Sequence, residues 1–207
     1  MISREHLSRS LERAGLQLGQ SSLEALWSYV ELLVRWNRRI NLTGFSFETN
    51  AEAAIERLLR EPLAAARIAR PARRILDVGS GSGSPAIPFF LGLGRASELV
   101  LVESRAKKAV FLREALRATG IPGTVVADRF EHLVVPEPFD AITVRAVAAG
   151  APLWTLVDRA LGSDGRLYWF HSASQAQPEQ DVVSWSKPVR LLDGESMVSI
   201  GARPDES

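Results

Sequence analysis

The chain has 207 residues, of which 46% are hydrophobic and 24% charged, with no cysteine and a formal net charge of +1. That length fits one α/β domain with a small appendage and is too short for two full-sized domains. The lack of cysteine excludes a disulfide framework, a thiolate metal site and a cysteine nucleophile. A charge this close to zero excludes a general attraction of the whole surface for nucleic acid, so any such binding must use local patches.

The beginning of the chain does not predict export. Its first fifteen residues mix arginine and glutamate with leucine, unlike the apolar core of a signal peptide. No apolar stretch approaches the roughly 18 residues needed to span a bilayer. The three histidines, His6, His132 and His171, do not stand in a pattern that suggests metal ligation. We therefore expect a cytoplasmic protein without a membrane contact or a metal site.

The first third of the chain is predicted to be helical. Leu23, Leu26, Val30 and Leu33 recur at three- and four-residue steps, which is typical of a helix with one apolar face. Residues 51–69 are rich in good helix formers and are interrupted only by a proline, Pro62. Asn and Gly in residues 41–44 favour a turn between the two segments. We expect residues 1–69 to form a helical cap that packs on a catalytic domain of residues 70–207.

From residue 74 onward, short apolar runs alternate with helical segments. This alternation is typical of βαβ units and a mainly parallel sheet. Strands are expected at residues 74–78, 98–102, 124–127, 139–144 and 166–170. Two more apolar runs, 189–192 and 197–200, flank Asp193-Gly194, a strong hairpin signal, so two antiparallel strands should complete a seven-stranded sheet. Residues 205–207 are expected to be a frayed tail.

A glycine-rich loop follows the first predicted strand. Glycines stand at positions 79, 81 and 83, and Pro85 suits the first turn of the helix that follows. Glycines let the backbone turn tightly and lie close to a ligand, while amides at a helix start favour anionic groups. The loop is therefore expected to bind a nucleotide-like cofactor.

The glycine spacing distinguishes two cofactors. A dinucleotide fingerprint is G-x-G-x-x-G, and its third glycine would fall on Ser84. Here Asp77 stands two residues ahead of Gly79, Gly81 and Gly83. The arrangement resembles motif I of class I methyltransferases, which implies a Rossmann-like fold and S-adenosylmethionine as the cofactor. The spacing disfavours an NAD-dependent oxidoreductase, the alternative.

Acidic residues end the next two predicted strands. Glu103 lies twenty residues after Gly83, where a carboxylate can accept hydrogen bonds from both ribose hydroxyls. Asp128 ends the following strand, near the place expected for an adenine amino group; each acid could instead cap a helix. The cofactor-binding residues are expected to be Asp77, Gly79, Ser80, Gly81, Gly83, Pro85, Glu103, Ser104, Asp128, Arg129, Phe130, Glu131 and Arg145.

Further strings extend from about residue 25 to residue 195. They are Trp36-Asn37, Asn41-Leu42-Thr43, Asp77-Val78-Gly79-Ser80-Gly81 with Pro85 and Ile87-Pro88, Leu101-Val102-Glu103-Ser104, Lys107-Lys108, Phe111-Leu112, Arg129, Glu131, Phe139-Asp140, Arg145-Ala146 and Asp193-Gly194-Glu195. In order and approximate spacing they resemble the 16S ribosomal RNA guanine-N7 methyltransferase family, also called glucose-inhibited division protein B. The resemblance implies methyl transfer to guanine N7 in small-subunit ribosomal RNA. That atom carries a free lone pair, so no general base is required and alignment of the reactants matters most.

The resemblance also implies roles for individual residues. Arg145 would face the cofactor or the target nucleotide and is the residue expected to be catalytic, because ligands bind at the carboxyl ends of parallel strands. Lys107 and Lys108 would lie near the cofactor pocket or the RNA backbone, or be plain surface charge. Asn41 and Thr43 could reach the RNA or only stabilise their own turn. A monomer acting on small-subunit ribosomal RNA is expected.

Six positions depart from the family pattern. Arg57 and Arg60 replace a His and an Asp, Ala86 a Gly, Val144 a Ser, His171 a Lys, and Ser196 an Arg. The lost Lys and Arg remove two potential phosphate contacts, which Arg57 and Arg60 could supply instead. These departures leave open a small-molecule methyltransferase, or a non-catalytic relative that binds cofactor or RNA.

Overall fold

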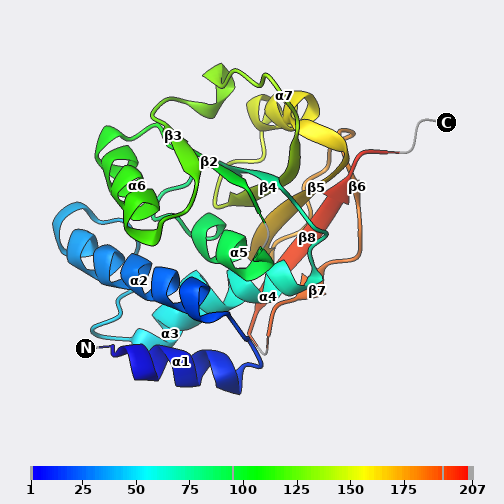
Figure 1. Cartoon of the computed structure of the whole chain (residues 1–207). Helices are drawn as coiled ribbons and strands as arrows, with labels where there is room; N and C mark the ends of the chain where they lie inside the picture. The colour runs from blue at the N-terminus through cyan, green and yellow to red at the C-terminus, as the bar shows by residue number, and fades with distance from the viewer. Residues whose placement is uncertain (1, 95, 193, 205–207) are drawn as a thin grey trace.

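The computed structural model describes residues 2–94, 96–192 and 194–204 and is drawn in Figure 1. In this part of the chain the helices are α1 (Arg4–Arg13), α2 (Gln20–Ile40), α3 (Ala51–Ile55), α4 (Glu61–Ile68), α5 (Ala86–Leu93), α6 (Ala106–Thr119) and α7 (Ala151–Ala160), with a π-helical turn η1 (Glu56–Arg60) and a 3-10 turn η2 (Phe130–His132). The strands are β1 (Arg74–Val78), β2 (Glu98–Val102), β3 (Gly123–Val126), β4 (Phe139–Arg145), β5 (Leu161–Ser172), β6 (Ser184–Trp185), β7 (Val189–Arg190) and β8 (Ser196–Ala202).

The strands form one mixed sheet in the order β3-β2-β1-β4-β5-β8-β6, and β7 also pairs with β8. Strands β1 to β5 run parallel, and β8 is antiparallel to β5. In the described part of the chain the sheet therefore has eight strands, one more than predicted, because the two-residue strands β6 and β7 both pair with β8. The predicted α/β fold with a mainly parallel sheet is confirmed.

The predicted strand bounds hold best where apolar runs are uninterrupted. Strands β1 and β2 have the predicted bounds, whereas β3 lies one residue earlier than predicted and β4 ends one residue later. The prediction was wrong for β5, which begins at Leu161 rather than at residue 166. Gly162 and Gly165 hid this start, because glycine disfavours strands, yet Leu161 pairs with Phe139 ahead of a register shift in the ladder. Strand β6 was missed.

The predicted C-terminal hairpin is present in part. Strands β7 and β8 are antiparallel neighbours, with Val189 opposite Val198 and Arg190 opposite Met197. The first strand is two residues long and not the predicted four. Asp193, in the predicted turn, and the predicted tail at residues 205–207 lie outside the described residues.

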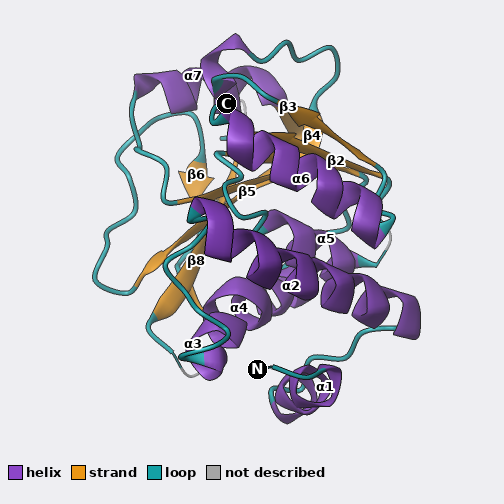
Figure 2. Ribbon diagram, turned by 90° about the vertical axis from the view of Figure 1, so that its left-hand side faces the viewer, coloured by secondary structure: helices purple, strands orange, loops and turns teal. Residues whose placement is uncertain are grey.

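Two hydrophobic cores cover the two faces of the sheet. One contains Ile75, Leu99 and Leu101 from the strands together with buried residues of α2, α4, α5 and α6. The other contains Leu76, Val100 and further strand residues packed against α7. The side chains alternate because successive residues of a strand point to opposite faces. Figure 2 shows α7 on one side of the sheet and α2, α4 and α5 on the other.

The predicted helical cap is part of the first core. Leu26, Val30 and Leu33 on α2 are buried in the same cluster as Ile75 of β1. The predicted apolar face of α2 therefore packs toward the sheet. Residue 69 therefore marks a change of secondary structure within a continuous core. The division into a cap and a catalytic domain remains our proposal about the organisation of the chain.

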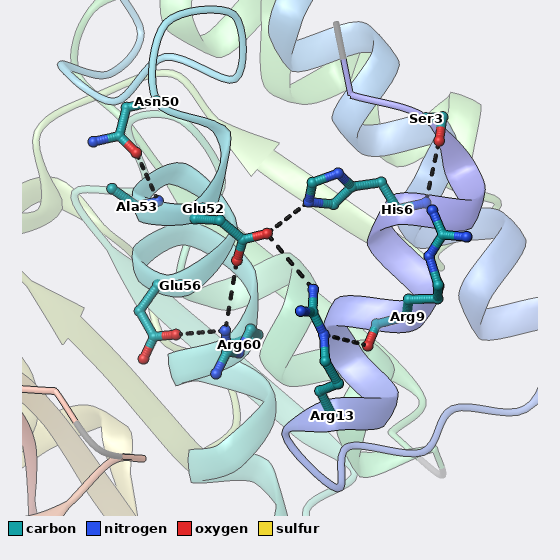
Figure 3. Close-up of polar contacts among 9 residues, drawn as sticks. All are labelled: Ser3, His6, Arg9, Arg13, Asn50, Glu52, Ala53, Glu56 and Arg60. Carbon is teal, nitrogen blue, oxygen red and sulfur yellow. Dashed lines mark hydrogen bonds and ion pairs between the residues drawn. The ribbon is translucent and has the colours of Figure 1, made fainter.

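Helix α1 lies at the outer edge of the cap, against α2 and α3. Leu7 and Leu11 bury its apolar face. Figure 3 shows the polar contacts beside them: Glu52 of α3 lies 2.6 Å from His6 Nε2 and 3.9 Å from a guanidinium nitrogen of Arg13. Exposed pairs of this kind contribute little to stability, so apolar burial is the main force holding α1 in place.

The second cap segment is one helical run, α3-η1-α4, and Pro62 does not interrupt it. Pro62 occupies the first turn of α4, where its missing N–H is tolerated. The irregularity falls just before it, where the Glu61 N–H bonds to the Glu56 carbonyl, five residues back. Within the described residues, no helix is long and apolar enough to cross a membrane.

Candidate active site

The glycine-rich loop joins β1 to α5 in the middle of the sheet. The N–H groups of Gly79 and Ser80 both donate to the Val102 carbonyl at 3.0 Å, which fixes the loop against the end of β2. Gly79, Gly81 and Gly83 have φ of 72°, 53° and 83°, values that L side chains rarely adopt. The predicted tight turn is therefore present, and all three glycines are required by the backbone.

Two adjoining hollows open beside this loop. The smaller, about 290 Å³, is lined by Gly79, Val102, Glu103, Ser104, Asp128, Arg129, Phe130 and Glu131. The larger, about 530 Å³, is lined by Leu42, Thr43, Phe45, Arg57, Leu58, Gly79, Ser80, Gly81, Ser82, Ser84, Glu103, Ser104, Arg105, Lys108, Arg145, Ala146 and Val147. Gly79, Glu103 and Ser104 line both, so the hollows form one elongated site at the carboxyl ends of β1, β2 and β4.

Glu103 occupies the junction of the two hollows. One carboxylate oxygen accepts from the Gly81 N–H at 2.9 Å and the other from the Arg105 N–H at 2.8 Å. These two bonds hold the carboxylate in place, and each oxygen keeps capacity for a further donor. A vicinal diol is a ligand that such a carboxylate can bind.

The smaller hollow is closed by the segment after β3. Asp128 Oδ1 accepts from the Arg129 N–H at 2.6 Å and lies 3.1 Å from His132 Nδ1. The hydrogen bond from the Arg129 backbone, followed by that from His132, holds the pKa of Asp128 below its usual value. Phe130 supplies a half-buried aromatic ring. The hollow can therefore hold a planar apolar ring whose edge meets a hydrogen-bond acceptor.

Asp77 lies beneath the loop and is fully buried. Its Oδ1 accepts from Thr143 Oγ1 at 2.5 Å, while its Oδ2 is buried with no hydrogen-bond partner among the described residues. Burial raises the pKa of Asp77 to about 6, and the hydrogen bond from Thr143 opposes that rise. A buried oxygen without a partner is costly. Asp77 lines neither hollow, but Gly79, two residues further on, lines both, so this oxygen lies near the site and has capacity to accept from a ligand.

Arg145 is the last residue of β4, and its side chain is only 9% exposed. Its Nη1 donates to the Arg57 carbonyl at 2.7 Å, and its guanidinium lies 4.9 Å from the centre of the Phe170 ring. Nε and Nη2 are buried without a hydrogen-bond partner in the described part of the chain. Burial lowers the pKa of Arg145 to about 10, so it remains charged at neutral pH. These two nitrogens can donate to an anionic group.

The π-helical turn η1 supplies carbonyls to this site. The Glu61 N–H bonds to Glu56 and not to Arg57, its α-helical partner, and Pro62 has no N–H to offer. The Arg57 carbonyl accepts instead from Arg145, and the Leu58 carbonyl accepts from Ser84 Oγ at 2.7 Å. Pro62 thus leaves carbonyls available to side chains of the site.

A buried ionic network lies behind Arg145. Glu61 accepts from Arg57 at 2.9 Å and from Ser196 Oγ at 2.5 Å, and one of its oxygens lies 3.7 Å from Arg145 Nη2. Arg57 also donates to Ser196 Oγ at 2.8 Å. Two of the replaced family positions, Arg57 and Ser196, are therefore joined through Glu61, a partner that sequence comparison did not single out.

The other replaced positions lie away from the hollows. Ala86 and Val144 are fully buried in the two cores. The Nδ1 of His171 donates to the Ser172 carbonyl at 2.9 Å, and its Nε2 lies 2.8 Å from Ser199 Oγ. Arg60 lies 3.0 Å from Glu56 and 3.9 Å from Glu52 (Figure 3). Of the two arginines suggested as phosphate ligands, only Arg57 lines the site.

Sequence reasoning missed Tyr29, which ties the cap to the loop. Its hydroxyl donates to the Ser82 carbonyl at 2.7 Å, and burial raises the pKa of that hydroxyl. The available signal was a tyrosine within the apolar stripe of α2, since a buried Tyr needs a hydrogen-bond partner.

The remaining predicted residues divide into two groups. Thr43 and Lys108 line the larger hollow, as do Gly79, Ser80, Gly81, Ser104 and Arg145. Gly83 and Pro85 are buried behind the loop, Asn41 ends α2 with φ 52°, and Lys107 is exposed; none of these four is among the lining residues. The lining residues that were not among the predicted site residues are Leu42, Phe45, Leu58, Ser82, Ser84, Val102, Arg105, Ala146 and Val147.

Comparisons with known proteins agree with this architecture. The family model described as rRNA small subunit methyltransferase G matches residues 22–189. The chain belongs to this family. A ribosomal RNA small subunit methyltransferase G from Syntrophotalea carbinolica is 36% identical over 166 residues, covering 78% of this chain and 74% of that protein. One from Rhodopseudomonas palustris is 37% identical over 189 residues, covering 84% and 75%.

Solved structures show the same fold at low sequence identity. The mitomycin 7-O-methyltransferase MmcR has a TM-score of 0.60 at 13% identity and covers 99% of this chain and 74% of its own. MtNAS, solved with MTA and tNA, has a TM-score of 0.58 at 17% identity and covers 98% and 82%. The fold is that of class I methyltransferases, and membership of the rRNA small subunit methyltransferase G family makes this chain a methyltransferase.

Proposed function

We propose that this methyltransferase binds S-adenosylmethionine in the two hollows and transfers its methyl group to N7 of a guanine in small-subunit ribosomal RNA. The observation that carries the proposal is the elongated site around Glu103, with Arg145 in the lining of its larger hollow and Asp77 buried two residues ahead of Gly79, in a chain of this family. The ribosomal RNA named for the relatives is the substrate we assign here.

The residues present fit the cofactor. Its methionine end carries an ammonium and a carboxylate. Asp77 Oδ2 and Arg145 Nε and Nη2 lack hydrogen-bond partners among the described residues, although Arg145 Nη2 lies 3.7 Å from a Glu61 oxygen. Glu103 would accept from the ribose hydroxyls, and the adenine would lie against Phe130 with Asp128 at its edge. When bound, S-adenosylmethionine supplies a methyl group on a positively charged sulfur.

The residues of the chain would act by alignment. Guanine N7 has a free lone pair, so no proton has to be removed and the reaction requires no general base. Arg145 is held by the Arg57 carbonyl and the Phe170 ring. It would bind the end of the cofactor that lies in the larger hollow. A fixed geometry of this kind lowers the activation barrier, because the reactants are already oriented before the reaction begins.

Charge around the larger hollow supports a nucleic-acid substrate. Its lining includes four cationic side chains, Arg57, Arg105, Lys108 and Arg145, and one carboxylate, Glu103. This local excess contrasts with a net charge of +1 for the whole chain. Phosphates would be attracted to this opening in particular.

Cofactor binding is tested by calorimetry with a matched pair of glycine variants. Gly81 and Gly120 have φ of 53° and 67°, and a Cβ at either position meets nothing closer than 3.7 Å. Gly81→Val and Gly120→Val should therefore strain the backbone similarly, while only Gly81 lines the site. We expect S-adenosylmethionine binding to be lost in Gly81→Val alone. Absence of binding by the wild type would overturn the cofactor assignment.

The substrate is tested with small ribosomal subunits and naked 16S ribosomal RNA that lack the modification. Formation of 7-methylguanosine, identified by mass spectrometry after nuclease digestion, is the expected result. Cofactor binding with no methyl transfer to either RNA would contradict the assignment and favour a small-molecule substrate or a non-catalytic relative.

A further inference from the structure

Phe45 is an exposed aromatic residue at the rim of the site. Its side chain is 38% exposed, and it is the one aromatic among the exposed large hydrophobic residues in the described part of the chain. It lines the larger hollow of the site and also a separate, third hollow of about 160 Å³ between α2 and residues 43–48. The ring therefore separates two recesses and is accessible from the site.

The loop that carries Phe45 is held in place. The Thr43 N–H donates to Asn37 Oδ1 at 2.9 Å, and the Phe45 N–H donates to Thr43 Oγ1 at 3.2 Å. Leu42 and Phe47, on either side, are buried in the main core. Since both flanks are anchored, the exposure of Phe45 is a fixed feature of the fold.

Cations without protein partners line the same hollow. Within the described residues, the side chains of Arg105 and Lys108 form no ion pair, although both line the recess that Phe45 lines. Two arginines outside this hollow are paired by contrast, Arg38 with Glu48 and Arg74 with Glu98. The side chains of Arg105 and Lys108 are thus available to a ligand in the same hollow as Phe45.

We propose that Phe45 is the stacking platform for the unpaired base that receives the methyl group, with Arg105 and Lys108 binding its phosphates. This inference rests on the proposed function and extends it to the recognition of the nucleotide. An aromatic face beside free cations is the combination that binds single-stranded nucleic acid. A pocket for a small apolar substrate would instead bury its aromatic residues. The base must be unstacked, either in a single strand or flipped out of a helix, because a ring stacked in a duplex cannot reach a protein ring.

Steady-state methyl transfer to small ribosomal subunits tests the platform. Phe45→Ala should lower kcat/KM for the RNA about 5- to 150-fold, the range of base-aromatic stacking, through KM and without changing S-adenosylmethionine affinity. Phe45→Trp should retain activity, and Phe45→Leu, apolar but without a π face, should lose most of it. Ile68→Ala is the matched control, because Ile68 is 45% exposed and lines neither hollow.

A second measurement separates this inference from the proposed function. The probe is a short oligouridine with one central 2-aminopurine. The wild type should quench the fluorescence of the 2-aminopurine, and Phe45→Ala should abolish this quenching. Equal kcat/KM for the wild type and Phe45→Ala, or for the wild type and Phe45→Leu, would overturn the stacking role. If the wild type methylates no RNA, the proposed function fails, and the quenching result then decides whether Phe45 stacks on a base.

Discussion

The buried carboxyl of Asp77 should make cofactor binding depend on pH. Burial raises the pKa of Asp77 to about 6 in the cofactor-free protein, whereas an ammonium group beside it would favour the ionised form. Binding would then require the ionised carboxylate, and only that fraction of the protein is competent. We expect the affinity for S-adenosylmethionine to fall as the pH falls below about 6.

The size of this effect follows from the pKa. With a pKa of about 6, roughly a tenth of the protein is ionised at pH 5 and about nine-tenths at pH 7. The dissociation constant should therefore be about tenfold larger at pH 5 than at pH 7, which corresponds to a loss of ~1.4 kcal/mol in binding free energy. Titration calorimetry at both values, in buffers of equal ionic strength, measures the difference.

The same carboxyl should affect folding in the opposite direction, because the folded protein without cofactor favours the protonated form of Asp77. Its folded pKa is raised from 3.8, so its contribution to stability is fully present below pH 3.8 and is lost as the pH rises through about 6. Between pH 5 and pH 7 the cofactor-free wild type should lose about 1 kcal/mol relative to Asp77→Asn, in urea unfolding.

Two variants decide whether Asp77 is responsible. Asp77→Asn should bind the cofactor weakly and with no pH dependence between pH 5 and pH 7. Thr143→Val removes the hydrogen bond that opposes the raised pKa, so its binding midpoint should move to higher pH. Asp77 is not the responsible group if Asp77→Asn keeps the wild-type pH dependence, or if Thr143→Val moves the midpoint downward.

Three further substitutions test the contacts behind the site. Tyr29→Phe leaves the buried Ser82 carbonyl without a donor and should lower the free energy of urea unfolding by about 1–3 kcal/mol. An unchanged free energy would contradict the role of Tyr29 in joining the cap to the loop. Glu61→Gln leaves buried positive charge uncompensated and should cost about 3 kcal/mol, whereas Glu98→Gln at a surface pair should change the free energy of unfolding little. Pro62→Ala restores an N–H that competes for the carbonyls of η1, so cofactor affinity should fall about fivefold in calorimetry while thermal stability is kept; unchanged affinity would show that these carbonyls do not matter.

The sequence predicted best what depends on local patterns. Strands β1 and β2 were predicted to the residue because each is a short, mostly apolar run in which every residue after the first is buried. The start of β5 was not, because Leu161 belongs to the strand only through its pairing with Phe139. Tertiary pairing overrides local propensity at such positions.

The same limit applies to the site. Glycine spacing located the loop, and the strand ends located Glu103 and Arg145, since both signals lie within a few residues of sequence. The acceptor of the Arg145 hydrogen bond, the Arg57 carbonyl, could not be found this way, because Arg57 is 88 positions away. Phe45 also gave no signal, because its meaning depends on which recess its ring faces.

The cap and the sheet together form the site. The lining of the larger hollow combines Leu42, Thr43, Phe45, Arg57 and Leu58 from the cap with residues of the loop and of β4. Residues 1–69 therefore do more than cover one face of the sheet, because η1 fixes Arg145 through a backbone carbonyl and α2 fixes the loop through Tyr29. A shift of the cap would move the cofactor-binding and rim residues at once. Substitutions in α2 or η1 that leave the fold intact should consequently change cofactor and RNA affinity together, whereas substitution of Phe45, which supports no other part of the site, should change RNA affinity alone.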